Sequence, residues 1–258
     1  MNRDIEFKGI QNARDLGYLK TKDGRIIRSH ALIRSAKLSS ANHLDEHKLK
    51  DEYRLKKIID LRTPTERLEK PDAFIEGAEN LHMPVFRHVT AGISHEEEVQ
   101  LLHDSGGLSR FYYYMVINED CRSNFNKILS TIFTFPYEEG SILWHCTEGK
   151  DRCGLVSAFV LLALGVDLET VKEDYLLTNR VNEKKAQDYY EEIINSGKPV
   201  EEAEYVRDMF LAKPEYFDTS IEAIKLKYND FENYFENGLH IDKDMIRYFR
   251  KNILMDED

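Results

Sequence analysis

The hydrophobic pattern changes along the chain, from short apolar runs to longer amphipathic segments. The short runs, rich in Ile, Leu and Val and bounded by polar turns, predict β-strands. They lie at 25–33 (one or two strands), 57–61, 80–85 and 141–145. The predicted strands all fall in the first 150 residues. This part of the chain is therefore expected to form a small sheet.

Longer segments with apolar residues three and four positions apart predict helices. Ser39 or Ser40 is expected to cap the first, which continues to about Tyr53. The run 155–166 is apolar on all sides, which is typical of a buried helix. The charged stretch 183–212 predicts either a helical lid or a solvated helical pair. The other predicted helices are 94–106, 108–118, 124–135, 168–178, 182–195, 201–211, 214–227 and 243–252.

A small sheet followed by many helices predicts an α/β fold, with helices flanking the sheet and a helix-rich C-terminal half. The 258 residues show no internal repeat and no low-complexity linker, so we expect one domain spanning 1–258. The run Tyr112 to Tyr114 is expected to pack in the core, as aromatic stripes usually do.

Charge and cysteine content narrow the class of protein. The net charge of −11 argues against a nucleic-acid partner and against an anionic membrane surface. Three cysteines do not make a disulfide framework, and they suit a reducing compartment. The first residues have no apolar signal core, and the longest apolar run is too short to span a bilayer. We expect a cytoplasmic protein without an integral membrane segment; the oligomeric state stays open.

The chemistry of the chain is concentrated between the last predicted strand and the apolar helix. Residues 142–154 read Ile-Leu-Trp-His-Cys-Thr-Glu-Gly-Lys-Asp-Arg-Cys-Gly. A strand–loop–helix connection directs backbone N–H groups and the helix dipole at the loop, which favours a bound anion. Gly149 gives the loop the conformational freedom to curl. A phosphate-binding loop with a cysteine at its start is the prediction.

Cys146 and Arg152 have the residue types that phosphoryl transfer needs at the two ends of such a loop. A helix N-terminus and nearby cations lower a thiol pKa from about 8.5 to roughly 3.5–7.5, which makes a nucleophilic thiolate. The planar fork of an arginine can hold two phosphate oxygens during transfer. The loop therefore predicts a phosphatase that forms a cysteinyl-phosphate intermediate, which water then hydrolyses.

Residues 145–154 resemble the loop of a bacterial tyrosine-phosphatase family, which reads His-Cys-x-x-Gly-Lys-Asp-Arg-Thr-Gly. Its members include atypical dual-specificity and lipid-phosphatase-like enzymes. The matching segments outside the loop are 12–17, 33–38, 59–62 with Glu66, 174–179 and 216–254. The resemblance covers nearly the whole chain. It implies the cysteine-phosphatase fold, hydrolysis of phosphomonoesters without a metal or other cofactor, and substrates that include phosphotyrosine, phosphoserine or phosphothreonine, and phosphoinositides.

The resemblance also implies roles for single residues. Asp151 is the expected general acid, unless it only orients Arg152. Asp15 is the alternative acid, although it could instead cap a turn before Gly17. In relatives that accept inositol lipids the loop lysine helps to hold additional phosphates, which makes Lys150 a candidate for that role at the pocket mouth. The residues expected to bind the phosphate are Thr147, Glu148, Gly149, Lys150 and Cys153.

Residues around the loop are expected to support it. His145 should orient the cysteine through the backbone. Asp60 is expected to be structural, beside an ion pair between Arg62 and Glu66. The arginines that could reach the pocket are Arg14, Arg34 and Arg180.

Two positions depart from the family's loop. Glu148 places a carboxylate in an anion-binding loop, where an inward orientation would weaken phosphate binding and an outward one would cost little. Cys153 stands where the family has Thr or Ser, whose hydroxyl is expected to hydrogen-bond the departing thiolate. A thiol is a weaker donor, so the intermediate is expected to break down more slowly. Cys153 could also form a reversible disulfide with Cys146, or be a buried thiol.

Other functions remain as alternatives. Arsenate reductases and sulfurtransferases also place a cysteine in an anion loop, but the Lys150–Asp151 pair and the matches outside the loop favour a phosphatase. An inositol-phosphate phosphatase is a second possibility. A protein that binds a phosphorylated ligand and turns it over slowly is a third, and Glu148 and Cys153 are its only support.

Overall fold

The fold is built on a five-stranded sheet with the order β1-β3-β6-β4-β5, in a computed structural model that describes residues 3–86 and 107–256. Strands β3, β6, β4 and β5 are parallel, and β1 runs antiparallel beside β3. A separate antiparallel pair joins β2 to β7. The strands are β1 (Arg14–Asp15), β2 (Ile26–Ile27), β3 (Leu32–Ser35), β4 (Leu55–Asp60), β5 (Glu79–His82), β6 (Ser141–His145) and β7 (Leu254–Met255).

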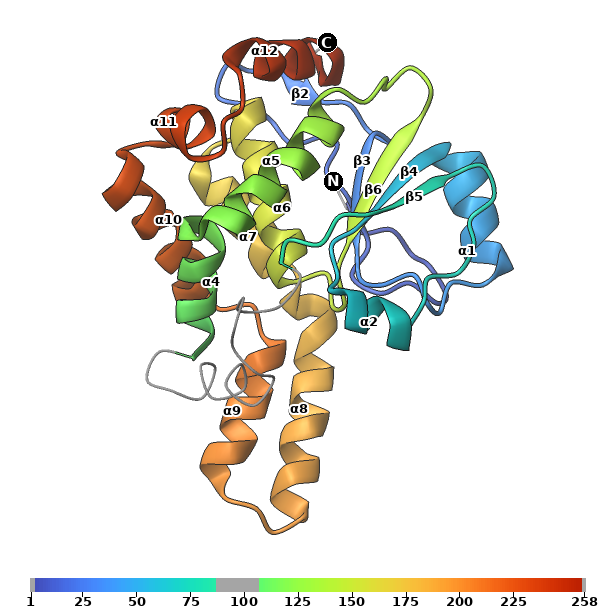
Figure 1. Ribbon diagram of the computed structural model, residues 1–258. Helices are drawn as coiled ribbons and strands as arrows, with labels where there is room; N and C mark the ends of the chain where they lie inside the picture. Colours follow the sequence, from blue (N-terminus) through green and yellow to red (C-terminus); the bar gives the residue numbers. More distant parts are fainter. Residues whose placement is uncertain (1–2, 87–106, 257–258) are drawn as a thin grey trace.

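Helices cover both faces of this sheet, and most of them follow β6 in the chain (Figure 1). None of the helices in the described ranges is long and apolar enough to cross a membrane. The helices are α1 (His43–His47), the π-helical turn η1 (Lys48–Glu52), α2 (Pro64–Glu69), α4 (Gly107–Ile117), α5 (Glu119–Phe133), α6 (Asp151–Leu164), α7 (Leu168–Leu176), α8 (Asn179–Asn195), α9 (Val200–Phe210), α10 (Pro214–Tyr228), α11 (Phe231–Asn233), η2 (Tyr234–Gly238) and α12 (Lys243–Ile253).

Alternating side chains of the central strands supply two separate cores, because successive strand residues point to opposite faces. On β6, Ile142 and Trp144 pack into the larger core with the helices that follow it. Leu143 points the other way, into a smaller core with Ile58 of β4 and Leu49 of η1. All five residues of β6 are buried, so this strand is the centre of the molecule.

The loop after β6 is thereby placed at the centre of the sheet's carboxyl edge. Its two neighbours, β3 and β4, run parallel to β6 and end beside it, with Ser35 and Asp60 opposite His145. Open α/β sheets bind ligands in the crevice outside such strand ends. The α/β architecture, its small sheet and the helix-rich C-terminal half agree with the sequence prediction.

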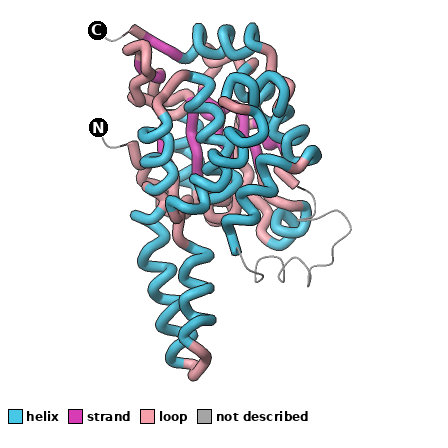
Figure 2. Tube along the Cα trace, turned by 90° about the vertical axis from the view of Figure 1, so that its left-hand side faces the viewer, coloured by secondary structure: helices cyan, strands magenta, loops and turns pink. Residues whose placement is uncertain are grey.

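Helices α8 and α9 pack against each other and form a hairpin that extends away from the body, as both views show (Figures 1 and 2). Tyr189 stacks on Phe210 within the hairpin, with the ring centroids 4.8 Å apart. Its sequence, 179–210, contains most of the charged stretch in which a lid or a solvated pair was expected.

Several predicted boundaries are wrong. The helix after the loop begins at Asp151 rather than at 155, so Arg152 and Cys153 lie in its first turn. The segment 40–53 is not one α-helix, because the short α1 is capped by Asn42, which forms a capping box with Asp45, and continues as a π-helical turn. Helix α2 was not predicted, although a Thr63 cap, Pro64 and Glu66 mark its start. The predicted helix 94–106 lies outside the described residues.

Candidate active site

The loop between β6 and α6 is fixed from outside by hydrogen bonds to its carbonyl groups. The backbone N–H of Lys37 donates to the carbonyl of Thr147 (3.2 Å), and the Asn12 side chain donates to the carbonyls of Glu148 (2.9 Å) and Gly149 (3.2 Å). A planar trans peptide places its C=O and the following N–H on opposite sides. The N–H groups after these three carbonyls therefore point inward, as an anion-binding loop requires.

Gly149 allows the loop to approach the end of β3. Its φ of +67° lies in the left-handed region, and a Cβ at this position would be 2.7 Å from the backbone of Ser35. Both observations require glycine. Arg34 of β3 donates to the Gly149 carbonyl at 2.8 Å, so the strand also holds the loop through a charged side chain.

Positive charge is buried behind the loop, and within the described ranges only one carboxylate pairs with it. Arg14 and Arg34 are 1% and 0% exposed, and with Arg3 they share one carboxylate, that of Asp174. Burial and then the charge of Arg34 lower the pKa of Arg14 to about 10. Burial would raise the pKa of Asp174, but the three arginines lower it. Unpaired buried charge is costly, so this arrangement favours an anion in front of it.

Arg152 and Glu66 form a bidentate ion pair at the helix start. The two terminal nitrogens of Arg152 donate to the two carboxylate oxygens of Glu66 at 2.6 and 2.8 Å, and the hydroxyl of Thr147 also donates to Glu66. Burial would raise the pKa of Glu66, but these bonds lower it to about 2. The predicted ion pair between Arg62 and Glu66 is wrong, because Glu66 pairs with Arg152 instead. A guanidinium has five N–H donors and Glu66 takes two of them, so three remain for phosphate oxygens.

Glu66 was not recognised from the sequence as a site residue. The motif Thr63-Pro64-x-Glu66 is a capping box, and the Glu66 carboxylate accepts from the Thr63 backbone N–H at 2.9 Å. This motif fixes the start of α2 at the carboxyl edge of the sheet. It could have indicated a carboxylate held in place there, but not that the partner is Arg152.

Asp151 is the first residue of α6, beside Arg152 in the chain. The hydroxyl of Tyr112 donates to its Oδ1 atom at 2.6 Å, and the Lys150 ammonium lies 3.3 Å from the same atom. The Asp151 side chain is 23% exposed, so it can reach a ligand. The prediction that the run Tyr112 to Tyr114 packs in the core holds for Tyr112 but is wrong for Tyr113, which is exposed. The Tyr112 hydroxyl reaches the site.

Lys150 does not lie at the pocket mouth as expected. It is 1% exposed, and its ammonium donates to the carbonyls of Met209 (2.5 Å) and Leu211 (3.3 Å) at the end of α9. An ammonium has three N–H donors, and Asp151 takes the third. Lys150 therefore joins the loop to the α8–α9 hairpin and has no donor left for a ligand in this conformation.

Glu148 points toward the hairpin. Its two carboxylate oxygens lie 2.8 and 2.9 Å from the Lys185 ammonium of α8. Lys185 also lies 4.9 Å from the centroid of the Phe210 ring. The negative charge of Glu148 is therefore compensated by an adjacent cation, which is the outward alternative.

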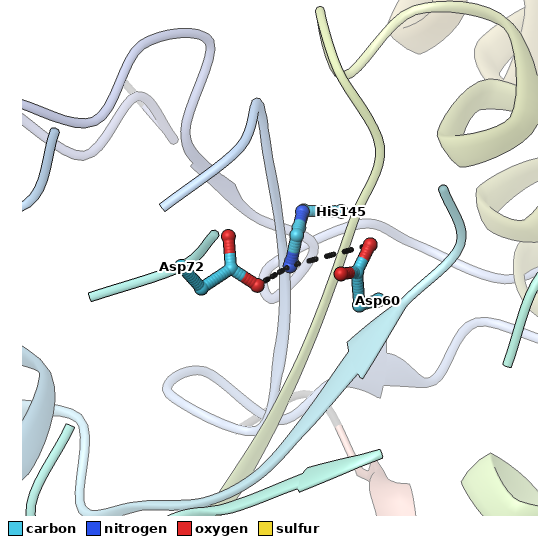
Figure 3. A group of neighbouring side chains, drawn as sticks. All are labelled: Asp60, Asp72 and His145. Atoms are coloured by element: carbon cyan, nitrogen blue, oxygen red, sulfur yellow. Dashed lines mark ion pairs between the residues drawn. The ribbon is translucent and has the colours of Figure 1, made fainter. Parts of the chain in front are cut away.

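His145 lies in a buried cluster of charged side chains (Figure 3). Its Nε2 atom lies 3.0 Å from Asp72 and 4.0 Å from Asp60, and its Nδ1 lies 3.3 Å from the carbonyl oxygen of Cys146. These three side chains are the donor types of a metal site. However, the Arg62 guanidinium already bridges the two carboxylates at 2.8 and 2.9 Å and takes the place of a cation. The cluster instead anchors His145 from behind.

Cys146 and Cys153 are both buried and both are free thiols. The Cys153 thiol donates to the carbonyl of Trp144 at 3.7 Å, and burial raises its pKa to about 11. Among the described residues no hydrogen bond joins it to Cys146. A protonated thiol attacks a sulfenic acid or a disulfide poorly, which disfavours the redox pair.

Asp15 and Arg180 make their side-chain contacts outside the loop between β6 and α6. The Asp15 carboxylate accepts from the backbone N–H groups of Gly17 (2.8 Å) and His30 (2.7 Å), the latter near the amino end of β3. Burial raises its pKa. These contacts correspond to the turn-capping alternative and not to a general acid. Arg180 is exposed and pairs with Asp4.

The fold and the loop together indicate the class: an α/β phosphatase whose candidate site lies at the carboxyl edge of the central sheet. A family model described as "Tyrosine phosphatase family" matches residues 5–255. The chain belongs to the tyrosine phosphatase family, and it is a phosphatase, a hydrolase.

Individual relatives agree with this assignment. A Cupriavidus necator protein named "Putative tyrosine-protein phosphatase" is 25% identical over 244 residues, which are 95% of this chain and 87% of that protein. The "Triple specificity protein phosphatase PtpB" of Mycobacterium tuberculosis is 38% identical over 58 residues, 22% of this chain and 21% of that protein. The match to the crystal structure of P. aeruginosa TpbA covers 59% of this chain and 71% of that chain at 17% identity, with a TM-score of 0.31.

Replacement of Glu66 by Gln should lower stability in a pH-dependent way. Gln keeps the capping box of α2 but removes the charge that pairs with Arg152. Because the folded pKa is depressed to about 2, the stabilisation is present above the unfolded pKa of about 4.5 and disappears as the pH falls between these values. Denaturant unfolding should show a difference of about 2 kcal/mol at pH 6. A difference that is unchanged at pH 2.5 would contradict this account.

Peroxide treatment should leave Cys153 reduced. Its burial and high pKa keep it a poor nucleophile, so oxidation should be confined to Cys146. Mass mapping of tryptic peptides after mild oxidation gives the readout. A peptide in which Cys146 and Cys153 are joined would show that the disulfide forms after all.

Proposed function

We propose that this phosphatase hydrolyses phosphomonoesters, with phosphotyrosine as the first substrate class, through a cysteinyl-phosphate intermediate on Cys146. The observation that carries the proposal is that Arg14 and Arg34 share the single carboxylate of Asp174 behind a loop whose carbonyl groups are bonded from outside. A phosphate dianion in the loop would supply the missing negative charge. Thr147 and Gly149 would bind it through the main chain.

Each step of this reaction has a residue at the site. The Cys146 sulfur attacks phosphorus while the bond from phosphorus to the ester oxygen breaks. Asp151 gives its proton to that leaving oxygen, which departs as the free alcohol or phenol. Water then attacks phosphorus and loses a proton to Asp151, the S–P bond breaks, and inorganic phosphate and the Cys146 thiolate are released.

Arg152 holds two equatorial phosphate oxygens in this scheme. Glu66 holds the Arg152 fork in a fixed plane through two bonds. A fork already in place loses little side-chain entropy when phosphate binds, and it can follow the charge as it redistributes. Glu66 is thus a positioning residue for Arg152 in the proposed mechanism.

The α8–α9 hairpin is proposed as a lid on this site. It is attached to the loop by Lys150, through the carbonyls of Met209 and Leu211, and by the Lys185–Glu148 ion pair. The two attachments are at the residues directly before and after Gly149, so they would couple movement of the hairpin to the shape of the loop.

Phosphoinositides rank behind phosphotyrosine as substrates. Their main support from the sequence was Lys150, and its ammonium is occupied by Met209, Leu211 and Asp151. The relative named as a triple specificity phosphatase matches over only 58 residues. Its name indicates more than one substrate class for that relative and does not rank proteins above lipids.

A binding protein with slow turnover is the second candidate. Glu148 no longer supports this alternative, because Lys185 compensates its charge. Cys153 remains the one departure from the family's loop that favours it.

Replacement of Cys146 by Ser should abolish phosphate release. The wild-type protein should release phosphate from a phosphotyrosine peptide faster than from phosphoserine peptides or phosphoinositides, and the variant should retain less than about one thousandth of that rate. Cys121→Ser is the matched control, because Cys121 is an equally buried cysteine in α5. Residual activity of the Cys146 variant close to wild type would refute the cysteinyl intermediate. An inert wild type that still binds the peptide would establish the slow-turnover alternative.

Replacement of Cys153 by Thr should speed breakdown of the intermediate. A hydroxyl is a stronger donor than a thiol, and one hydrogen bond to the departing thiolate corresponds to about a two- to tenfold gain in steady-state turnover. The burst of alcohol release should stay while the later rate rises. Cys153→Ala serves as the control without a donor. Equal turnover in the wild type, the Thr variant and the Ala variant would show that position 153 has no role in this step.

A further inference from the structure

Three side chains from three helices form a hydrogen-bonded chain that ends on Asp151. The hydroxyls of Tyr175 in α7 and Tyr112 in α4 lie 2.8 Å apart, and that of Tyr112 donates to Asp151 Oδ1 at 2.6 Å. A phenol has a single proton to donate. Because Tyr112 gives its proton to Asp151, the bond between the two tyrosines must run from Tyr175 to Tyr112.

Both tyrosines are held in place by their rings. They are 0% and 1% exposed, and their rings meet edge to face at 6.0 Å between centroids. Tyr112 also stacks on Tyr216 of α10, and Tyr175 stacks on Phe217. Burial raises the pKa of both phenols well above the usual value, so both stay protonated and keep their donor role.

Gly154 lets the hydrogen-bonded row of Tyr175, Tyr112 and Asp151 lie against α6. A Cβ at this position would be 3.0 Å from the Cδ2 atom of the Tyr175 ring, which is tighter than ordinary packing. The glycine is in the first turn of α6, three residues after Asp151. The absence of a side chain there allows Tyr175 to approach the start of the helix.

Both partners of the Asp151 side chain bind the same oxygen. Tyr112 donates to Oδ1 and the Lys150 ammonium lies 3.3 Å from it, while Oδ2 has no partner among the described residues. An oxygen that accepts two donors is a poor place for a proton. When Asp151 is protonated, its proton therefore belongs on Oδ2.

We propose that Tyr112, supported by Tyr175, is a positioning residue that occupies Asp151 Oδ1 and so places the transferable proton on Oδ2, toward the leaving oxygen. This inference deepens the proposed function and rests on it. The hydroxyl of Tyr112 touches neither substrate nor reacting atoms. Its contribution is to select which carboxylate oxygen acts and to fix the plane of the carboxyl group.

The test compares two esters whose leaving groups differ in basicity. Phenoxide is the stronger base, so phenyl phosphate needs a proton donor more than 4-nitrophenyl phosphate does. The value of kcat/KM reports the steps up to formation of the phosphoenzyme, independently of how quickly it breaks down. Tyr112→Phe removes the hydroxyl alone. It should lower kcat/KM about tenfold for phenyl phosphate and less than about threefold for 4-nitrophenyl phosphate.

Two further variants separate positioning from packing. Tyr216→Phe removes the hydroxyl of the ring that stacks on Tyr112. This Tyr216 hydroxyl has no hydrogen bond among the described residues, so kcat/KM for both esters should stay near wild type. In an Asp151→Asn background, Tyr112→Phe should change kcat/KM by less than about twofold, since the coupling is lost with the acid. Tyr175→Phe should show a smaller loss with the same dependence on the leaving group.

Several outcomes would overturn the inference. They are an equal loss for both esters, a loss that persists in the Asp151→Asn background, or the same loss in Tyr216→Phe. If Tyr112→Phe fails to fold, the leaving-group dependence of Tyr175→Phe decides in the same way. A wild type that hydrolyses neither ester refutes the proposed function and this inference together, whereas an active wild type with equal losses refutes the inference alone.

Discussion

Arg34 holds the site together, because one buried side chain joins the sheet, the loop and a helix. The Arg34 side chain extends from β3 and is fully buried. It donates to the Gly149 carbonyl and pairs with Asp174 of α7 at 2.8 Å. With Arg14 nearby, the charge behind the loop is only partly balanced. A guanidinium cannot release its proton to relieve this, so an anion in the loop is the remaining source of compensation.

The other charged residues of the site are arranged in pairs around this centre. Arg152 lies against Glu66, Lys150 against Asp151, and Lys185 against Glu148. The first pair joins α6 to α2, the second joins the loop to the start of α6, and the third joins the loop to α8. In the proposed mechanism these pairs fix the loop before an anion binds, which lowers the reorganisation that binding and transfer require. An acidic protein can in this way keep one local site positive.

Much of the fold was predictable because its signals are local. The apolar run of β6, the turn-rich segment around β2 and β3, and the helices of the last 100 residues follow from periodicity and length. Boundaries were less accurate. The start of α6 was missed by four residues because Asp151, Arg152 and Cys153 carry no apolar pattern. The capping box that starts α2 is also a local signal and could have been recognised.

The sequence alone predicted the loop and proposed Cys146 as its nucleophile and Arg152 as its arginine, because residue type and spacing along a strand–loop–helix connection are typical of an anion site. Only the tertiary structure decided the partners: Glu66 for Arg152, Tyr112 for Asp151, and the end of α9 for Lys150. These contacts join residues 39, 59 and 86 positions apart in the chain. No local pattern encodes them, since they depend on how the sheet and the helices pack around the loop.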